Sequence, residues 1–235
     1  MPTATLIQKK ELNPSTTSLS FSMKESLGFF GGQYIIVESN IPLNEEKNVK
    51  RAYTLASSDS NQKEFTIFYK RIEEGIVTNQ YLDHLKIGEE IKFSGPWGKF
   101  LKNEEFATKG PTLLVATDTG IATAIGFLQS ERMKNILHNV DLKWFVPSND
   151  YFLSKEKVEK TFSGKLGNFE IHAAPPFGKE RGDDFYMAME TLVENSNYSS
   201  YFLCGDGEVV KRGKEVLLNR GHDEEQIGTK TYFNK

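Results

Sequence analysis

Eleven residues decide the fold of this 235-residue chain: Leu113-Leu114-Val115-Ala116-Thr117-Asp118-Thr119-Gly120-Ile121-Ala122-Thr123. The apolar run at their start is typical of a strand buried on both faces of a parallel sheet. A turn that contains a glycine follows, and a helix-like stretch then begins at Ala122. Strand, turn and helix N-terminus together can hold an anion such as pyrophosphate on free backbone N–H groups. On its own, the pattern also fits an ordinary connection between a strand and a helix.

The residues after this stretch continue the alternation of helices and strands. We predict a helix at 122–134, followed by strand-like and helix-like ranges in turn at 141–146, 154–162, 168–174, 183–194, 201–204, 208–219 and 229–233. This alternation indicates an open, doubly wound α/β sheet. Lys109-Gly110-Pro111 precedes the first strand, and we place a boundary near residues 102–110, which gives domains 1–105 and 106–235.

The first hundred residues contain short β-rich ranges separated by turn signals such as Asn13-Pro14-Ser15 and Gly31-Gly32. The ranges are 3–11, 16–23, 33–38, 51–55, 64–70 and 89–95. Strands of this length and spacing predict a six-stranded antiparallel β-barrel, which removes its sheet edges by closing. We expect one short helix from Asn79 to about Leu85, with Thr78 as its N-cap.

Composition excludes several classes of function. Charged residues make up 26% of the chain and the net charge is −3, so no basic surface for nucleic acid is expected. The single cysteine, Cys204, excludes an internal disulfide framework and an iron–sulfur cluster held by thiolates of this chain alone. Four histidines without a ligand-like cluster argue against a structural zinc site. With no apolar run near the roughly 20 residues of a membrane helix and no secretory signal, we expect a cytoplasmic protein without membrane insertion.

The segment Arg51-Ala52-Tyr53-Thr54 lies on a predicted strand and suits a flavin. Arginine offers a fork of donors to phosphate oxygens, an aromatic ring packs on the ring system, and a hydroxyl can bond its reactive edge. Strand alternation would send Arg51 and Tyr53 to one face, and Ala52 and Thr54 to the other, unless the strand bends. Alone, the segment also fits a plain strand with an exposed arginine.

Two further segments follow in the same part of the chain. Gly75-Ile76-Val77-Thr78-Asn79 opens the short helix, where free N–H groups favour an anion and the glycine permits close approach. It also fits a simple turn before a capped helix. Gly95-Pro96-Trp97-Gly98-Lys99-Phe100 reads as a tight, rigid turn, to which we assign no chemistry.

In this order and spacing, the three segments resemble the ferredoxin–NADP reductase superfamily. Its FAD-binding domain carries an Arg-x-Tyr-Ser/Thr strand, a Gly-x-x-Ser/Thr helix start and a Gly-Pro-x-Gly-x-Phe turn. The resemblance implies bound FAD, with Arg51 at its phosphates, Tyr53 on the flavin and Thr54 at the reactive edge. The residues expected to bind FAD on this basis are Arg51, Tyr53, Thr54, Tyr69, Gly75, Val77 and Thr78.

The second half resembles the nucleotide-binding domain of the same family. Its loop, Gly-Thr-Gly-Ile-Ala-Pro after a strand, is matched with Asp118 in place of the first glycine and Thr123 in place of the proline. The loss of proline is minor, since threonine also serves at a helix start. A carboxylate beside a pyrophosphate would repel it, although an aspartate can instead cap the helix.

Two later segments also resemble the family. Tyr201–Gly205 is similar to its Cys-Gly strand end, where the cysteine faces the nicotinamide, although such a cysteine is otherwise a buried apolar residue. Lys230-Thr231-Tyr232-Phe233 is similar to its closing segment, with lysine where an acid is usual. This leaves Tyr232 or Phe233 near the flavin or forms only a final strand, which we favour. The resemblance implies Thr54 and Cys204 as the residues that flank the reacting atoms, and nucleotide or flavin contacts from Thr117, Thr119, Gly120, Cys204, Gly205 and Tyr232.

The implied activity is hydride transfer between NADPH or NADH and bound FAD, followed by electron transfer to a separate acceptor. Ferredoxin or flavodoxin is the first acceptor expected. Alternatives are a reductase of free flavin, or the reductase component of an oxygenase or larger complex. Asp118 favours a different class, a non-catalytic flavin-binding subunit or sensor, and a scaffold without any cofactor is the plainest alternative.

The choice between the two nucleotides stays open in the sequence. Ser148 would tolerate a 2′-phosphate and Lys155 could pair with it, whereas Asp150 could bond a 2′-hydroxyl. The family resemblance alone favours NADPH slightly.

Overall fold

The computed structural model of the protein describes residues 1–45, 47–98, 110–148, 151–162, 164–178, 180–194 and 196–232. The chain forms two compact units, one of Met1–Gly98 with Ile125–Glu131 and the other of Lys99–Ala124 with Arg132–Lys235. The domain boundary expected between residues 105 and 106 lies outside the described residues. In the parts of the chain that are described, no helix is long and apolar enough to cross a membrane.

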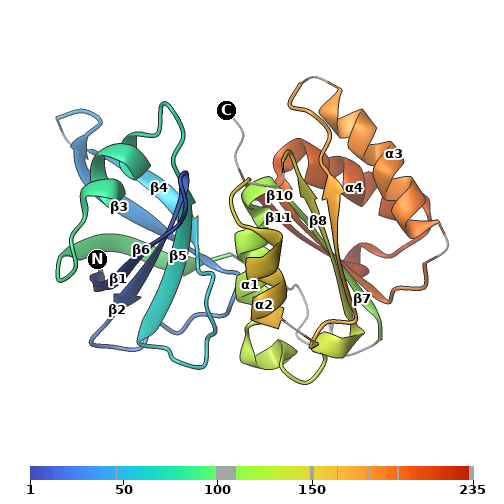
Figure 1. The fold of residues 1–235 in the computed structure, drawn as a ribbon, viewed down its shortest axis with the longest axis horizontal. Coiled ribbons are helices and arrows are strands. Elements are labelled where there is room, and N and C mark those ends of the chain that lie inside the picture. Colours follow the sequence, from blue (N-terminus) through green and yellow to red (C-terminus); the bar gives the residue numbers. More distant parts are fainter. Residues whose placement is uncertain are drawn as a thin grey trace. The chain divides into compact units, whose positions relative to one another are not determined.

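The first unit carries a six-stranded antiparallel sheet in the order β4-β3-β6-β1-β2-β5 (Figure 1). Its strands are β1 (Thr3–Asn13), β2 (Thr16–Ser22), β3 (Tyr34–Pro42), β4 (Asn48–Thr54), β5 (Glu64–Lys70) and β6 (Glu90–Trp97). The six predicted strands are thus confirmed. One antiparallel bridge joins Leu55, just beyond β4, to Ile67 of β5, and these strands are the two edges of the sheet. Complete closure into a barrel stays a prediction.

Alternating side chains build the core of this sheet. In β5, Phe65, Ile67 and Tyr69 are buried, while the residues between them are partly exposed. The Phe65 ring stacks on Phe21 with 5.4 Å between centroids and meets Phe93 edge-on at 5.6 Å. Period-two burial of this kind brings side chains of β5, β2 and β6 together in one apolar core.

The short helix differs from the expected one. It begins as a π-helical turn, η1 (Ile76–Tyr81), and continues as a 3₁₀ turn, η2 (Leu82–His84). Gly75 occupies the N-cap, so the prediction of Thr78 as the cap is wrong. The reason is a distant partner, because the hydroxyl of Thr78 shares a hydrogen bond of 3.0 Å with the hydroxyl of Tyr53. Single π-helical turns are frequent at functional sites.

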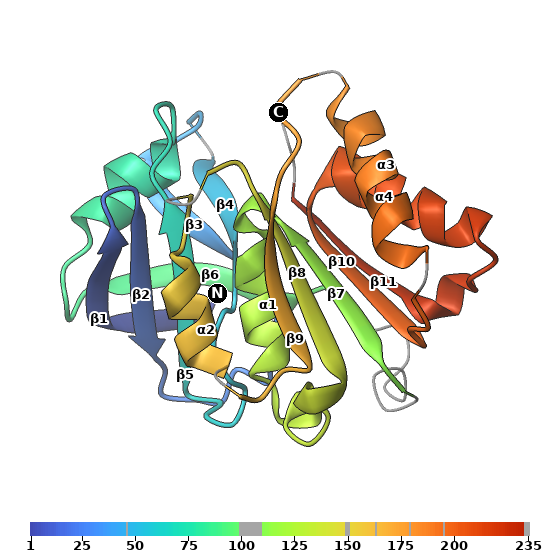
Figure 2. The same cartoon turned by 45° about the vertical axis from the view of Figure 1, so that its right-hand side comes forward.

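The second unit carries a five-stranded parallel sheet in the order β11-β10-β7-β8-β9. Its strands are β7 (Thr112–Thr117), β8 (Val140–Val146), β9 (Asn168–Ala173), β10 (Ser200–Asp206) and β11 (Ile227–Tyr232). Helices α1 (Ile121–Leu128) and α2 (Lys155–Phe162) lie on one face, and α3 (Arg181–Val193) and α4 (Gly207–Asn219) on the other (Figures 1 and 2). The doubly wound prediction is confirmed, and the strand order reverses between β7 and β10.

The burial of the two central strands, β7 and β10, explains why the sequence predicts this parallel sheet well. Every residue of β7 and of β10 is buried, as expected for strands covered by helices on both faces. Helix α1 is shorter than the expected 122–134, because the chain turns after Leu128 and the Ser130 N–H bonds to the carbonyl of Phe127. Among the described residues, further 3₁₀ turns lie at Asp118–Gly120, Glu131–Met133, Leu137–Asn139 and Glu224–Gln226.

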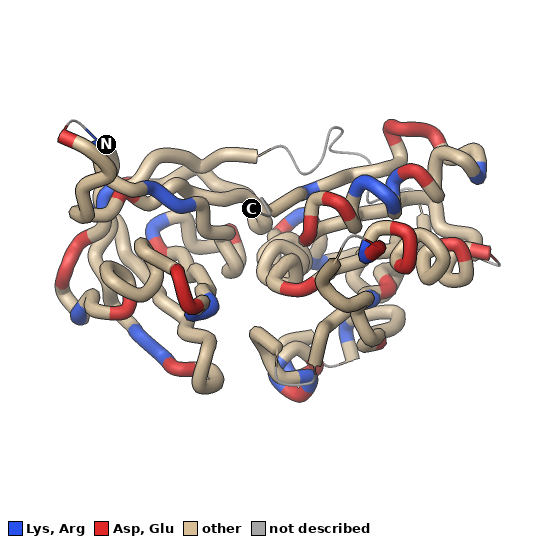
Figure 3. The backbone as a smooth tube through the Cα atoms, turned by 90° about the horizontal axis from the view of Figure 1, so that it is seen from above, with Lys and Arg blue, Asp and Glu red and all other residues tan. Residues whose placement is uncertain are grey.

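Charged residues of both signs are interspersed along the backbone of each unit (Figure 3). Net charge over the whole sequence is −3. This pattern agrees with the expectation of an ordinary solvated surface rather than a basic face for nucleic acid.

Candidate cofactor and nucleotide sites

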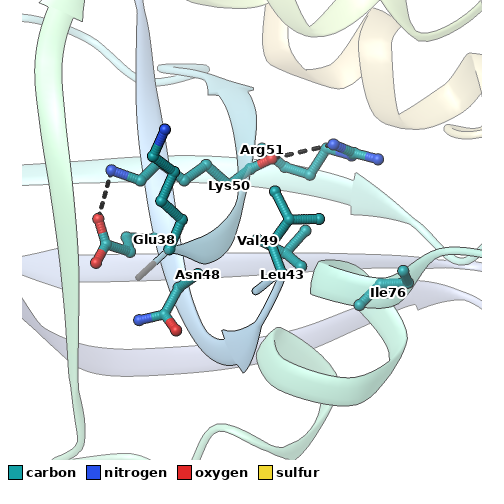
Figure 4. Close-up of a pocket in the computed structure, with 8 residues that line it drawn as sticks. Glu38, Leu43, Asn48, Val49, Lys50, Arg51 and Ile76 are labelled. Carbon is teal, nitrogen blue, oxygen red and sulfur yellow. Dashed lines mark hydrogen bonds and ion pairs between the residues drawn. The ribbon is translucent and has the colours of Figure 1, made fainter. Parts of the chain in front are cut away.

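A pocket of about 490 Å³ lies on the first unit, where β3 and β4 meet the start of η1 (Figure 4). Its lining combines basic and amide side chains with an apolar wall: Glu38, Leu43, Lys47, Asn48, Val49, Lys50, Arg51 and Ile76. Lys50 is paired with Glu38 at 2.6 Å, and this hydrogen bond lowers the pKa of the Glu38 carboxyl. The pocket therefore offers cationic donors beside a surface on which a flat ring can lie.

Arg51, which we predicted to contact the phosphates of FAD, is an exposed cation in this pocket. One Nη1 N–H donates to the carbonyl of Lys50 at 3.1 Å, which leaves further N–H donors of the guanidinium for an anion. Leu43 and Val49 supply the apolar wall behind it. This donor set fits a cofactor with phosphates and an adenine ring, as FAD has.

Tyr53 joins the strand of this pocket to its helical turn. Burial does not alternate along β4, because Arg51 and Ala52 are exposed while Tyr53 and Thr54 are both buried. The predicted alternation of faces is therefore not seen in the burial of this segment. Burial raises the pKa of the Tyr53 hydroxyl to about 12, and its hydrogen bond with Thr78 fixes η1 against β4.

Other residues expected at the flavin occupy the core of the unit. Val77 is buried in η1. Tyr69 donates its hydroxyl hydrogen bond to the Asp83 carboxylate at 2.7 Å, and Arg71 pairs with the same carboxylate at 2.8 Å. Burial raises the pKa of Tyr69 to about 12. The structure thus gives Tyr69 a partner in η2 and does not include it in the pocket lining.

In the second unit, two glycines bring the ends of β7 and β10 into direct contact. A Cβ atom on Gly120 would lie 2.3 Å from the carbonyl oxygen of Cys204, so only glycine fits there. Gly205 has φ of +138°, and a Cβ would lie 2.0 Å from the Thr117 hydroxyl oxygen. That oxygen also accepts a hydrogen bond from the N–H of Asp206 at 3.0 Å. Thr117, Gly120 and Gly205, all expected in the nucleotide site, are therefore assembled at one point.

Asp118 adopts the backbone conformation that glycine favours. Its φ is +53°, in the left-handed region, which accounts physically for the glycine that the resembled pattern has here. The N-cap of the following 3₁₀ turn is Thr117, and the alternative that Asp118 caps helix α1 stays a prediction. Its backbone carbonyl accepts a hydrogen bond from the Trp144 indole at 3.0 Å.

The carboxylate of Asp118 is held by Arg181, a residue that sequence reasoning missed. Nη2 of Arg181 reaches both Asp118 oxygens, at 2.8 Å and 2.7 Å, and Nη1 reaches Asp206 at 2.9 Å. All three side chains are buried. The other oxygen of Asp206 caps α4 by accepting from the N–H groups of Glu208 and Val209. Asp118 and Asp206 each follow a predicted strand, but only the strand order shows that these two strand ends are neighbours, so the sequence alone gives no signal for Arg181.

Cys204 is completely buried at the end of β10. Its thiol lies 3.4 Å from the carbonyl oxygen of Gly120 and 3.5 Å from that of Val115, to which it donates. Burial raises the pKa of the thiol to about 12. Lys230 is its register neighbour on β11, and burial lowers the pKa of this lysine to about 8.

The remaining expected site residues are placed as follows. Tyr232 ends β11, as the favoured final strand required, and its hydroxyl bonds to that of Thr123. Thr119 is half-buried in the turn after β7.

Two residues were considered for binding a 2′-phosphate. Lys155 pairs with Glu159 at 3.5 Å, and Ser148 is exposed beyond β8. Asp150 and Phe233 lie outside the described residues, and Thr54 and Cys204 belong to different units.

The burial of Cys204 predicts an inert thiol. Reaction with an alkylating reagent requires the thiolate, and a pKa near 12 leaves almost none of it at about pH 8. We expect no labelling of the folded protein over hours and one label per chain after denaturation, counted by mass spectrometry. Rapid labelling of the folded protein would contradict the buried position.

Comparison with known proteins identifies relatives for both units. Residues 3–101 match the family described as the oxidoreductase FAD-binding domain. The glycine betaine monooxygenase reductase subunit of Chromohalobacter salexigens is 30% identical over 207 residues, which cover 83% of this chain and 54% of that protein. NADH-cytochrome b5 reductase 1 of Cryptococcus neoformans is 28% identical over 227 residues, 91% of this chain and 71% of that protein. The chain thus spans about half the length of the first relative.

A solved structure shares the fold of the whole chain. It is a ferredoxin NADP⁺ reductase from Neisseria gonorrhoeae with bound FAD and NADP, at a TM-score of 0.77 and 18% sequence identity. The alignment covers 98% of each chain. At this identity the likeness concerns the fold, and both sheets take part in it.

Proposed function

The chain belongs to the ferredoxin reductase-like superfamily of FAD- and NAD(P)-binding oxidoreductases, and we propose on this basis that it is a flavoprotein reductase. It takes a hydride from NADPH or NADH onto bound FAD and passes the electrons to a separate acceptor. The observation that carries the proposal is the pocket of Arg51 and Lys47 beside the apolar wall of Leu43 and Val49, within the matched FAD-binding domain.

The residues of the first unit would bind and orient the cofactor. Arg51 supplies charge-assisted hydrogen bonds to phosphate oxygens, and the Tyr53–Thr78 hydrogen bond holds η1 in place beside it. Thr54 and Tyr53 are the proposed neighbours of the flavin ring. FAD supplies the acceptor atom for the hydride, so no acid–base pair of the protein is required.

The second unit would bind the nicotinamide nucleotide at the reversal of strand order between β7 and β10. Ligands of doubly wound sheets bind at the carboxyl ends of the strands at such a reversal. Thr119 and Gly120 lead into α1, whose first N–H groups favour a pyrophosphate. Arg181 offsets the charge of Asp118, which removes the main argument for a non-catalytic sensor.

The electron acceptor is proposed to be a separate protein. The relatives include a reductase subunit of a monooxygenase and a cytochrome b5 reductase, and each of these names refers to a second protein, a monooxygenase or cytochrome b5. An oxygenase component, or a small carrier such as ferredoxin or flavodoxin, fits this proposal. A reductase of free flavin is the alternative, and it would purify without FAD.

An anaerobic absorbance titration of the purified protein tests the proposal. We expect a bound flavin spectrum that bleaches on addition of NADPH or of NADH, and the nucleotide that acts at lower concentration is the physiological donor. A flavin that stays oxidised with both nucleotides would overturn the reductase function. Protein that purifies colourless but consumes NAD(P)H only with added flavin would instead establish the free-flavin alternative.

A further inference from the structure

The loops that follow four successive strands meet around one guanidinium. Asp118 comes directly after β7, Tyr151 lies beyond β8, Arg181 follows β9 as the first residue of α3, and Asp206 ends β10. Asp118 and Arg181 are close enough to Tyr151 to influence its titration, and burial raises the pKa of that hydroxyl to about 12. The strands are parallel, so these loops share the edge of the sheet at which doubly wound folds bind their ligands.

The contacts of Arg181 show what it does there. It donates to the Pro175 carbonyl from Nε at 3.2 Å, to Asp206 from Nη1, and to both oxygens of Asp118 from Nη2. Its guanidinium also lies 4.1 Å from the centre of the Phe177 ring. With 3% of its surface exposed and most of its donors engaged, Arg181 acts on a ligand through the residues that it holds.

The charge of this cluster determines what the loop can bind. A buried carboxylate that lacks a cation is costly, and one beside a pyrophosphate repels it. Asp206 is stabilised by the N-terminus of α4 as well as by Arg181. Asp118 begins the turn that leads into α1, and its carboxylate forms an ion pair with Arg181 at 2.7 Å.

We propose that Arg181 is the positioning residue that allows this aspartate-containing loop to accept a dinucleotide. It neutralises Asp118 and fixes the turn Asp118–Gly120 against the end of β10, so that the N–H groups of the turn and of α1 face the pyrophosphate. The ligand class is a nicotinamide dinucleotide, and the inference rests on the proposed function in this respect. A glycine in place of Asp118 would need no such residue.

Four variants test the inference: Arg181→Met, Arg181→Lys, Asp118→Gly and the double variant Asp118→Gly/Arg181→Met. The primary readout is the dissociation constant of NADP⁺ and of NAD⁺, measured by isothermal titration calorimetry on the FAD-loaded protein. We expect Arg181→Met to raise the dissociation constant of the tighter nucleotide at least about tenfold, because the Asp118 carboxylate in the loop loses its ion pair with Arg181. FAD content, read from the flavin absorbance, stays that of the wild type.

The other variants separate positioning from mere structural support. Asp118→Gly keeps or tightens nucleotide binding, since glycine suits the left-handed backbone at this position. In the double variant, binding returns to within about threefold of Asp118→Gly, and Arg181→Lys gives an intermediate loss. In steady-state assays the loss in Arg181→Met appears in KM for the nucleotide rather than in kcat. Arg212→Met is the matched control, because this arginine pairs with Asp183 and Glu215 at the surface of α3 and α4 and should leave binding unchanged.

Specific outcomes overturn the inference. A folded Arg181→Met protein that binds both nucleotides within twofold of the wild type excludes the role, and so does a wild type that binds neither nucleotide. If Arg181→Met does not fold, the double variant Asp118→Gly/Arg181→Met provides the test. Charge compensation is excluded if this double variant has wild-type stability but binds the nucleotide tenfold more weakly than Asp118→Gly does. Nucleotide binding that depends on Arg181 without any reduction of the flavin would leave this inference standing and defeat the proposed function.

Discussion

Replacement of Gly120 by alanine is expected to lower the free energy of unfolding of the second unit by about 3 kcal/mol. The new Cβ would lie 2.3 Å from the carbonyl oxygen of Cys204 and 2.7 Å from its carbonyl carbon. These atoms are backbone of a central strand, so neither can rotate away as a side-chain end would. The turn Asp118–Gly120 must separate from β10, and the contact that assembles the nucleotide site is lost.

Urea denaturation followed by tryptophan fluorescence measures this effect. Trp144 is buried and donates to the Asp118 carbonyl, so its share of the emission, beside that of Trp97 in the first unit, reports on this turn. Gly207→Ala is the matched control, because its Cβ would meet its nearest atoms at 3.6 Å and 3.9 Å, which is ordinary contact. We expect the control to change stability by less than about 0.5 kcal/mol. Equal stability of Gly120→Ala and wild type would show that the turn Asp118–Gly120 does not approach β10 at this carbonyl.

Replacement of Arg51 by alanine is expected to weaken FAD binding by roughly 10- to 100-fold. Hydrogen bonds from a charged donor contribute about 1.5–3 kcal/mol, and each 1.4 kcal/mol is a factor of about ten in affinity. The side chain is exposed in the pocket, so its removal should leave the stability of the sheet unchanged. The dissociation constant is measured by titrating FAD into apoprotein and following the quenching of flavin fluorescence.

Lys50→Ala is the control for this measurement. Lys50 lines the same pocket one residue away, but its ammonium is already paired with Glu38 at 2.6 Å. We expect a change of less than about threefold, since an exposed pair of this kind contributes little. If Lys50→Ala weakens FAD binding as much as Arg51→Ala does, the phosphates are bound by general positive charge and not by the guanidinium.

Local patterns in the sequence predicted the elements well where one period governs burial. Strand β5 runs over Glu64–Lys70 as expected, because its apolar residues alternate without interruption. The apolar run Leu113–Ala116 identified the centre of the parallel sheet for a similar reason, since burial on both faces leaves no place for a polar residue.

Local patterns could not show partners that are distant in the chain. Thr78 has the residue type of an N-cap, but its hydroxyl bonds to Tyr53, which lies 25 positions away. Asp118 reads locally as a repulsive charge or a cap, while its carboxylate pairs with Arg181 at a separation of 63 residues. No pattern of neighbouring residues encodes such pairs, because they depend on the order of the strands in the sheet.

The enclosed position of Cys204 bears on how the protein withstands oxidants. Sulfenic acid and disulfide formation need an accessible thiolate, and the chain has no second cysteine with which a crosslink within one molecule could form. Peroxide is therefore expected to oxidise the thioether sulfur of exposed methionines before it oxidises the thiol of Cys204. Met1 and Met187 are 64% and 65% exposed, so ageing in air should appear as methionine sulfoxide there, with the sheet and its only thiol still intact.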